Sequence, residues 1–244
     1  MTDYIIEAKG IEKTLGSGAG TVHALRGVDL SLRRGELTLL MGPSGSGKTT
    51  LLLILGCMLA PSGGHVTVCG VSTTDADKEA LAKIRRDHIG FVFQSYHLFP
   101  TLTAAQNVQL ALDIRGERGR KARERSREAL KMVGLEQKTK ALPHELSGGE
   151  QQRVAIARAI VANPSAVLAD EPTAALDGGN GQMLMRILAS IAHERGNAVL
   201  VVTHDPRVIP FADRIIRIED GHLVDERSDE PGLLRMPKAA NLGT

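Results

Sequence analysis

The feature that most constrains the fold of this 244-residue chain is a glycine-rich turn between an apolar strand and a helix. The turn reads GPSGSGKT from Gly42 to Thr49, follows the run LTLLM and precedes a second apolar run, LLLILG. It matches the pattern G-x-x-x-x-G-K-[ST] in the strand-to-helix setting that this pattern requires. A glycine-rich turn with an incidental lysine would explain the residues but not their placement. The turn therefore predicts an α/β fold with a phosphate site.

The chemistry of this turn suits a nucleoside triphosphate. Its glycines let several backbone N–H groups face one anion, and the start of the following helix adds partial positive charge. Lys48 can reach the β and γ phosphates, and the Thr49 hydroxyl can ligate Mg²⁺, which is held by few protein ligands. We therefore expect ATP and Mg²⁺ as cofactors, with nucleotide contacts from Ser44, Gly45, Gly47, Lys48, Thr49 and Thr50.

Strand-like and helix-like runs alternate along the rest of the chain. Four runs are nearly continuous in apolar residues, as strands covered on both faces are: 37–41, 89–93, 166–169 and 198–203. They predict an α/β core with a mainly parallel sheet. The first 35 residues differ, because runs 5–9 and 28–32 flank a Gly/Ser-rich turn at 16–20. This pattern predicts a smaller antiparallel sheet.

The strand signal disappears between residues 101 and 146, and residues 121–133 carry apolar residues at helical spacing. We expect one domain over residues 1–225 with an inserted helical subdomain at about 95–160. The basic helix could contact lipid or nucleic acid, but Glu124 and Glu128 favour a solvated face. Residues 226–244 show no clear period, so we expect a loosely ordered tail.

Composition limits the possible partners and compartment. The net charge of +2 gives no overall field that would direct the chain to nucleic acid or anionic lipid. Cys57 and Cys69 lie in apolar stretches, which suggests reduced thiols in a cytosolic compartment. The start MTDYIIEAKG lacks the pattern of a secretory signal. The longest apolar run, 51–60, is shorter than the roughly 20 residues that cross a bilayer. If the protein works at a membrane, we expect another chain to supply the span.

Carboxylate and imidazole groups follow other predicted strands. Asp170 and Glu171 end the apolar strand VLADE, which suits Asp170 to the Mg²⁺ shell and Glu171 to activating a water near the γ phosphate. His204 and Gln94 also follow strands, at the edge where ligands bind in open α/β sheets. We expect His204 to contact the γ phosphate and Gln94 to bind the metal-bound water or the nucleophile. A lone histidine is more often structural, and we interpret the other seven as surface or packing residues.

A second helix start also suits an anion. Ser147, Gly148 and Gly149 in LSGGE precede the helical run QQRVAIARAIVAN, so Ser147 can cap the helix while the glycines expose N–H groups. An ordinary serine-capped helix is the alternative. Because only one lysine turn is present, this second start makes sense if it completes the site of another copy of the chain.

Together these segments resemble the ABC ATPase family in content and order. Three segments look like its phosphate and signature motifs: Walker A at 42–49, Walker B in VLADE at 167–171, and the signature in LSGGE at 146–150. Three more look like its Q-loop at Gln94, its D-loop in AALD at 174–177 and its H-switch at His204. The resemblance spans about residues 5 to 225. It implies an ATPase with a P-loop core, an antiparallel β subdomain and a helical subdomain.

The resemblance also implies an assembly. In the family, two subunits stack head to tail, so Ser147 and Gly149 would act in trans on the partner's ATP, and Asp177 would lie near the nucleotide. The Q-loop segment and helical subdomain grip a coupling helix of a transmembrane permease. We therefore expect a homodimer on ATP binding, peripheral to the cytoplasmic face of the inner or plasma membrane, with membrane contact only through the permease and no nucleic-acid partner.

Two residues depart from the family pattern. Glu150 ends the signature where glutamine is commoner, which is not expected to abolish binding. Leu15 stands where the family generally has a base-stacking tyrosine, and with Val22 it is expected at the nucleotide base. Aromatic stacking on a base contributes about 1–3 kcal/mol in nucleic-acid complexes, so Leu15 predicts weaker or less base-selective binding.

Within the family, the chain is similar to the macrolide-exporter and lipoprotein-releasing branch in four segments: 91–100, 101–108, 168–172 and 201–205. This similarity implies export or mechanotransmission through a permease. A cell-division ATPase of the same branch, which acts on a membrane partner without transport, is the main alternative. A DNA-repair ATPase would need a long coiled coil between Walker A and signature, and no sustained heptads are present. A translation-associated ATPase would need two cassettes in one chain, whereas this sequence contains one set of these motifs.

Overall fold

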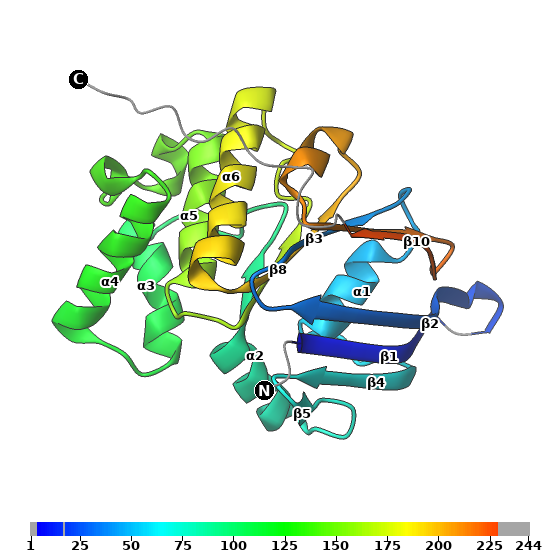
Figure 1. The fold of residues 1–244 in the computed structure, drawn as a ribbon. Helices are drawn as coiled ribbons and strands as arrows, with labels where there is room; N and C mark the ends of the chain where they lie inside the picture. The colour runs from blue at the N-terminus through cyan, green and yellow to red at the C-terminus, as the bar shows by residue number, and fades with distance from the viewer. Residues whose placement is uncertain (1–3, 17, 229–244) are drawn as a thin grey trace.

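The structure, a computed structural model, describes residues 4–16 and 18–228. Its strands form two sheets (Figure 1). The six-stranded sheet has the order β10-β9-β3-β8-β7-β6, and the four-stranded sheet has the order β2-β1-β4-β5. The strands are β1 Tyr4–Leu15, β2 Val22–Arg33, β3 Leu37–Met41, β4 Gly63–Val68, β5 Val71–Ser72, β6 Ile89–Val92, β7 Ala166–Asp170, β8 Ala198–Thr203, β9 Arg214–Glu219 and β10 His222–Ser228.

The six-stranded sheet is parallel apart from its last strand. β3 pairs in parallel with β8 and β9, and β7 pairs in parallel with β8 and β6, while β10 runs antiparallel to β9. Every residue of β3 and β8 is buried, which is why these strands are continuous apolar runs in the sequence. The predicted α/β fold with a mainly parallel sheet is confirmed.

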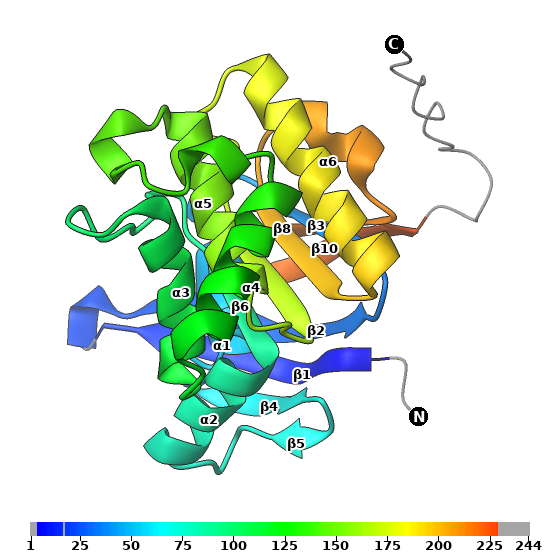
Figure 2. The same cartoon turned by 90° about the vertical axis from the view of Figure 1, so that its left-hand side faces the viewer.

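Helices and short 3₁₀ turns connect the strands. The helices are α1 Lys48–Leu55, α2 Lys78–His88, α3 Ala104–Ile114, α4 Gly119–Met132, α5 Gly148–Ile160 and α6 Gly178–Arg195, and the 3₁₀ turns are η1 Gly18–Gly20, η2 Glu136–Lys138, η3 Pro143–Glu145 and η4 Pro206–Phe211. Figure 2 shows α3, α4, α5 and α6 together in front of the strands. None of the helices in the described part of the chain is long and apolar enough to cross a membrane.

Two apolar cores lie on opposite faces of the six-stranded sheet. Leu37 and Leu39 of β3 belong to a core shared with residues of α3, α4, α5 and α6. Leu40, which points to the other face, belongs to a core shared with α1 and with β1 and β2 of the smaller sheet. α1 contacts both sheets. Because successive side chains of β3 point to opposite faces, one face of the sheet packs on α1 and the smaller sheet. The phosphate-binding turn, which precedes α1, therefore lies between the two sheets.

Several boundaries differ from those expected. The antiparallel strands β1 and β2 are longer than the runs 5–9 and 28–32, because Glu12 to Leu15 continue to pair with β2 up to Val22, and the expected turn at 16–20 lies between the two strands. Residues 226–228 belong to β10, paired with β9, so the expected tail does not begin at 226. The remainder of that predicted tail, 229–244, lies outside the described residues. α2, β4, β5, β9 and β10 carry no separate prediction from the sequence.

Candidate nucleotide site

The turn between β3 and α1 can only be built with glycine at several positions. Gly45 and Gly47 have positive φ angles of 81° and 101°, a region that side chains other than glycine rarely adopt. A Cβ on Gly47 would lie 2.4 Å from the Ala24 carbonyl oxygen, and one on Gly42 would lie 2.1 Å from that of Ile218. The turn is therefore pressed against β2 and β9, which fixes its N–H groups beside the start of α1.

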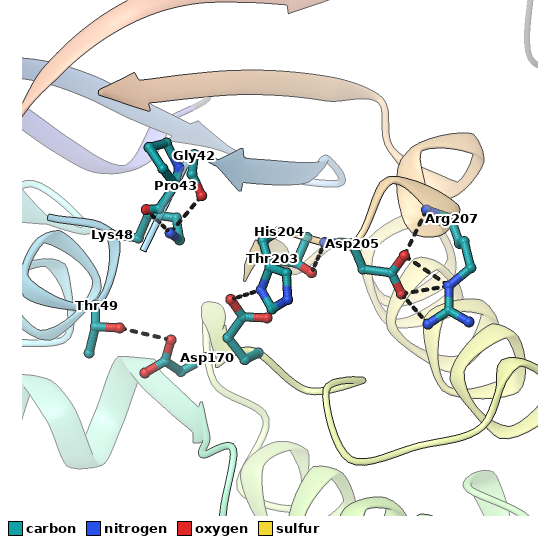
Figure 3. A network of polar contacts seen from close by, with 10 residues as sticks. Gly42, Pro43, Lys48, Thr49, Asp170, Thr203, His204, Asp205 and Arg207 are labelled. Carbon is teal, nitrogen blue, oxygen red and sulfur yellow. Dashed lines mark hydrogen bonds and ion pairs between the residues drawn. The ribbon is translucent and has the colours of Figure 1, made fainter. Parts of the chain in front are cut away.

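Lys48 is folded back over this turn. Its Nζ donates to the carbonyl oxygens of Gly42 at 2.8 Å and Pro43 at 2.7 Å (Figure 3). Burial lowers the pKa of Lys48, and the negative charges of Glu171 and Asp170 oppose that shift. Burial deprives the Lys48 ammonium of water, so a phosphate bound in the turn would stabilise it by supplying a charged hydrogen-bond acceptor.

Thr49 and Asp170 bring two oxygen donors together. The Thr49 hydroxyl donates to Asp170 Oδ1 at 3.2 Å. Burial raises the pKa of Asp170, while the Thr49 hydrogen bond and Lys48 oppose the shift and Glu171 adds to it. Hydroxyl and carboxylate oxygens are the donors that Mg²⁺ prefers, and Mg²⁺ takes few ligands from the protein. The described residues contain no cluster of three or more His, Cys, Asp or Glu side chains that could hold a metal. The Thr49–Asp170 pair thus fits a magnesium ion that is held mainly by phosphate and water.

Glu171 and His204 form an ion pair or hydrogen bond across the site. Glu171 follows β7 with a positive φ of 45°, and its N–H donates to the Val202 carbonyl of the neighbouring strand at 2.9 Å. Its Oε1 lies 2.8 Å from His204 Nδ1. The His204 side chain is 66% exposed and that of Glu171 only 15%. The carboxylate is therefore sheltered within the site, while the imidazole that contacts it is open to solvent.

Most of the expected site residues line one cavity of about 890 Å³. From the strand-to-helix turn come Ser44, Gly45, Gly47, Lys48, Thr49 and Thr50; from other elements come Leu15, Val22, Gln94, Glu171 and His204. Asp170 reaches the site through Thr49. Leu15 and Val22 are paired across β1 and β2, and the two residues are 40% and 60% exposed. They form an aliphatic, solvent-facing wall.

Ser147, Gly149 and Asp177 do not line this cavity. Ser147 caps α5, where its Oγ accepts from the Glu150 N–H at 3.3 Å. Asp177 caps α6, where Oδ1 accepts from the Asn180 N–H at 2.9 Å, and this contact is the main cause of its lowered pKa. Within this chain, the two helix starts therefore make caps rather than contacts with the cavity.

Other residues also line the cavity, among them His23 and His222, which the sequence predicts only as surface or packing residues. The others are Ala24, Arg26, Asp220 and Gly221. Gly221 is tied to the phosphate turn, because its N–H donates to the Ser46 carbonyl at 3.2 Å and its own carbonyl accepts from the Arg26 N–H at 3.0 Å. The Asp-Gly pair at 220–221 is a hairpin signal, but its position against the turn depends on the distant pairing of β9 with β3.

Comparisons with known proteins agree with this geometry. A family model described as an ABC transporter matches residues 25–174. An uncharacterized ABC transporter ATP-binding protein of Methanocaldococcus jannaschii, MJ0796, is 47% identical over 226 residues, which cover 91% of this chain and 96% of the relative. The macrolide export ATP-binding/permease protein MacB of Photorhabdus laumondii is 44% identical over 222 residues, 91% of this chain. This chain spans only 34% of that MacB protein.

A solved structure is similar over nearly the whole fold. It is a dimeric post-hydrolysis state of the ATP-binding cassette MJ0796 bound to ADP and Pi, with a TM-score of 0.85 and 45% identity, covering 91% of this chain and 98% of the other. A match of this extent and identity, together with the family model and the lysine turn, establishes both the fold and the ATPase chemistry. The chain belongs to the ABC transporter family, in which it is an ATP-binding and ATP-hydrolysing cassette.

Proposed function

We propose that two copies of this chain close around ATP and that the closure drives a separate transmembrane permease. The observation that carries the proposal is the separation of two anion-ready elements. One cavity holds the lysine turn, Glu171 and His204, whereas the glycine-rich start of α5 caps only its own helix. A head-to-tail pair would bring Ser147 and Gly149 of each copy to the ATP of the other. The dimeric structure of the MJ0796 cassette supports this arrangement.

The residues of the cavity divide the reaction among them. Lys48 and the N–H groups of the turn hold the phosphates, and Thr49 and Asp170, with Gln94 through water, would hold Mg²⁺. A bound Mg²⁺ supplies charge neutralisation on the phosphate oxygens. Glu171 accepts the proton of the attacking water, and His204 orients that carboxylate and can approach the γ phosphate. Asp177 joins the site only through the dimer.

A permease partner is supported by the names of the relatives. The MacB proteins, and a probable export ATP-binding/permease protein of Pseudomonas fluorescens that is 42% identical over 230 residues, combine both functions in one longer chain. We propose that this chain performs the ATP-binding part for a permease in another chain, at the cytoplasmic face of the membrane. The exporter names favour transport over the cell-division alternative.

The Glu171→Gln variant tests the assignment of the base. Glutamine keeps the shape of the side chain but cannot take a proton, so turnover should fall by at least about 10²-fold while ATP binding remains. Hydrolysis is measured under saturating ATP and binding by equilibrium titration. The matched control is Glu194→Gln, an exposed glutamate of α6 outside the cavity. Near-normal turnover of Glu171→Gln would remove Glu171 from this role.

The same variant tests the partner. Because it should hold ATP without turnover, it should keep the assembly closed during purification from detergent-solubilised membranes. We expect a multi-span permease to co-purify in ATP and to be reduced when Lys48→Ala replaces Glu171→Gln. Recovery of a soluble dimer with no membrane protein would contradict the permease proposal.

A further inference from the structure

The start of α5, which under the proposed function binds the phosphates of another copy's ATP, contains the carboxylate of Glu150. The Ser147 N–H donates to Glu150 Oε2 at 2.8 Å, and the Glu150 N–H donates to Ser147 Oγ at 3.3 Å. This reciprocal capping box satisfies two N–H groups of α5. The cap leaves a negative charge beside N–H groups that, under the proposed function, face the phosphates of another copy. Like charges repel there unless the carboxylate is compensated.

Lys138 compensates the oxygen that the cap does not use. Its Nζ lies 3.6 Å from Glu150 Oε1, while Oε2 is occupied by Ser147. The Glu150 side chain is 19% exposed and that of Lys138 is 46% exposed, so the pair lies at the edge of the protein with its carboxylate largely covered. Arg153 is a second basic neighbour on α5, and its Nη1 donates toward Met183 Sδ at 3.8 Å.

The backbone around Lys138 is fixed independently of the ion pair. The Lys138 N–H donates to the Leu135 carbonyl at 3.0 Å, and its own carbonyl accepts from the Ala141 N–H at 3.0 Å. The carbonyl of the next residue, Thr139, accepts from the Ala105 N–H of α3 at 3.0 Å. The loop between α4 and α5 is thus anchored on α3, which presents the lysine to the start of α5. Removing the Lys138 ammonium should therefore remove the positive charge beside Glu150 without changing the conformation of the loop.

We propose that Lys138 is a positioning residue for the second anion site, where it neutralises Glu150 so that a carboxylate can cap α5 without repelling the nucleotide phosphates of another copy. This inference rests on the proposed head-to-tail dimer. According to this inference, Glu150 in LSGGE is compatible with phosphate binding only because the Lys138 ammonium faces its free carboxylate oxygen. A neutral glutamine at the same position can form the same capping box and would have no need of the lysine.

A double-mutant cycle separates this electrostatic role from a structural one. ATP hydrolysis is measured for the unmodified chain, Lys138→Ala, Glu150→Gln and the double variant. We expect Lys138→Ala to raise KM for ATP about two- to fivefold, as suits one uncompensated charge at a partly exposed site, with kcat changed less. In the Glu150→Gln background the same change should have almost no effect. The rise in KM should also shrink at high salt, because screening weakens the repulsion.

Lys140→Ala is the matched control. Lys140 is exposed in the same loop, and no ion pair is found for it among residues 4–16 and 18–228, so its loss should leave KM unchanged. Equal effects of Lys138→Ala in both backgrounds, or no effect in either, would overturn the role of Lys138. If the unmodified chain hydrolyses ATP and dimerises with it, such a result leaves the proposed function standing. If the unmodified chain does neither, both proposals fail.

Discussion

Strand order sets the contact between Glu171 and His204. β7 and β8 are neighbouring parallel strands in which Asp170 is paired with Val202, so the residues that follow them emerge at one edge of the sheet. The positive φ of Glu171, uncommon for a residue other than glycine, turns its side chain toward the His204 ring. The backbone thereby places the proposed base, Glu171, beside the imidazole that is proposed to orient it.

Leu15→Tyr tests the aliphatic wall of the cavity. Leu15 is partly exposed and lines the site with its cross-strand partner Val22, so a tyrosine there can stack on the base. We expect Kd for ATP to fall about 5- to 150-fold, the equivalent of about 1–3 kcal/mol of stacking. The Kd for GTP should fall similarly, because every base has a π face. Val71→Tyr, at an exposed position of β5, is the control. Unchanged ATP affinity in Leu15→Tyr would contradict the assigned position of the base.

Cys57 predicts a loss of stability at alkaline pH. Burial raises the pKa of its thiol to about 11, with Arg85 opposing the shift. As pH rises above about 8.5 the unfolded thiol ionises first, so the unfolded state binds fewer protons than the folded one and the free energy of unfolding falls. Urea denaturation between about pH 8 and pH 10.5 should show a steeper loss for the unmodified chain than for Cys57→Ala. Cys69→Ala serves as control, and parallel curves for unmodified chain and Cys57→Ala would exclude this contribution.

Among the helices, Arg115 joins the ends of α2, α3 and α5. It follows α3, and its guanidinium donates to the carbonyls of Arg86 and Asp87 at the end of α2, each at 2.8 Å, and to that of Ala162 after α5. These carbonyls lie at helix ends, where backbone acceptors have no partner within the helix. One side chain thus ties three helix ends together, on the opposite end of α5 from Ser147.

Arg115→Ala should therefore destabilise the fold. It leaves acceptors without a donor at helix ends, which costs about 1–3 kcal/mol in the free energy of unfolding. Chemical denaturation measures the change. Arg118→Ala is the control, since Arg118 is exposed and none of the described side-chain hydrogen bonds at α4 involves its guanidinium. Equal stability of the two variants would show that the Arg115 contacts contribute nothing.

Elements with a strong local signal could be predicted, and those fixed by distant pairing could not. The glycine turn, the apolar strands β3 and β8 and the capped start of α5 are each encoded within a short stretch of consecutive residues. The expected P-loop fold is confirmed on this basis. By contrast, Asp220 and His222 reach the cavity because β9 pairs with β3, which lies far earlier in the chain. The network of Arg115 has no sequence pattern at all, because its acceptors are backbone carbonyls.

In the whole molecule, the proposed ATP site is complete only when two chains assemble. The cavity of one chain offers the lysine turn and a sheltered carboxylate, and we propose that the start of α5 offers its N–H groups to the cavity of the other chain. In a two-fold dimer each contact occurs twice, so two equivalent ATP sites form together. Binding of ATP would then favour the closed dimer by mass action, and hydrolysis would release it.

Mixing two inactive variants tests this claim most directly. Lys48→Ala removes the phosphate-binding lysine but keeps the start of α5, and Ser147→Arg blocks the start of α5 but keeps the lysine turn. Each variant alone should hydrolyse ATP poorly. In a mixed dimer, one site combines the intact turn of the Ser147→Arg chain with the intact α5 start of the Lys48→Ala chain. ATP hydrolysis of the mixture should rise above the sum of the separate variants; a mixture no more active than that sum would show that the two chains do not share an ATP site.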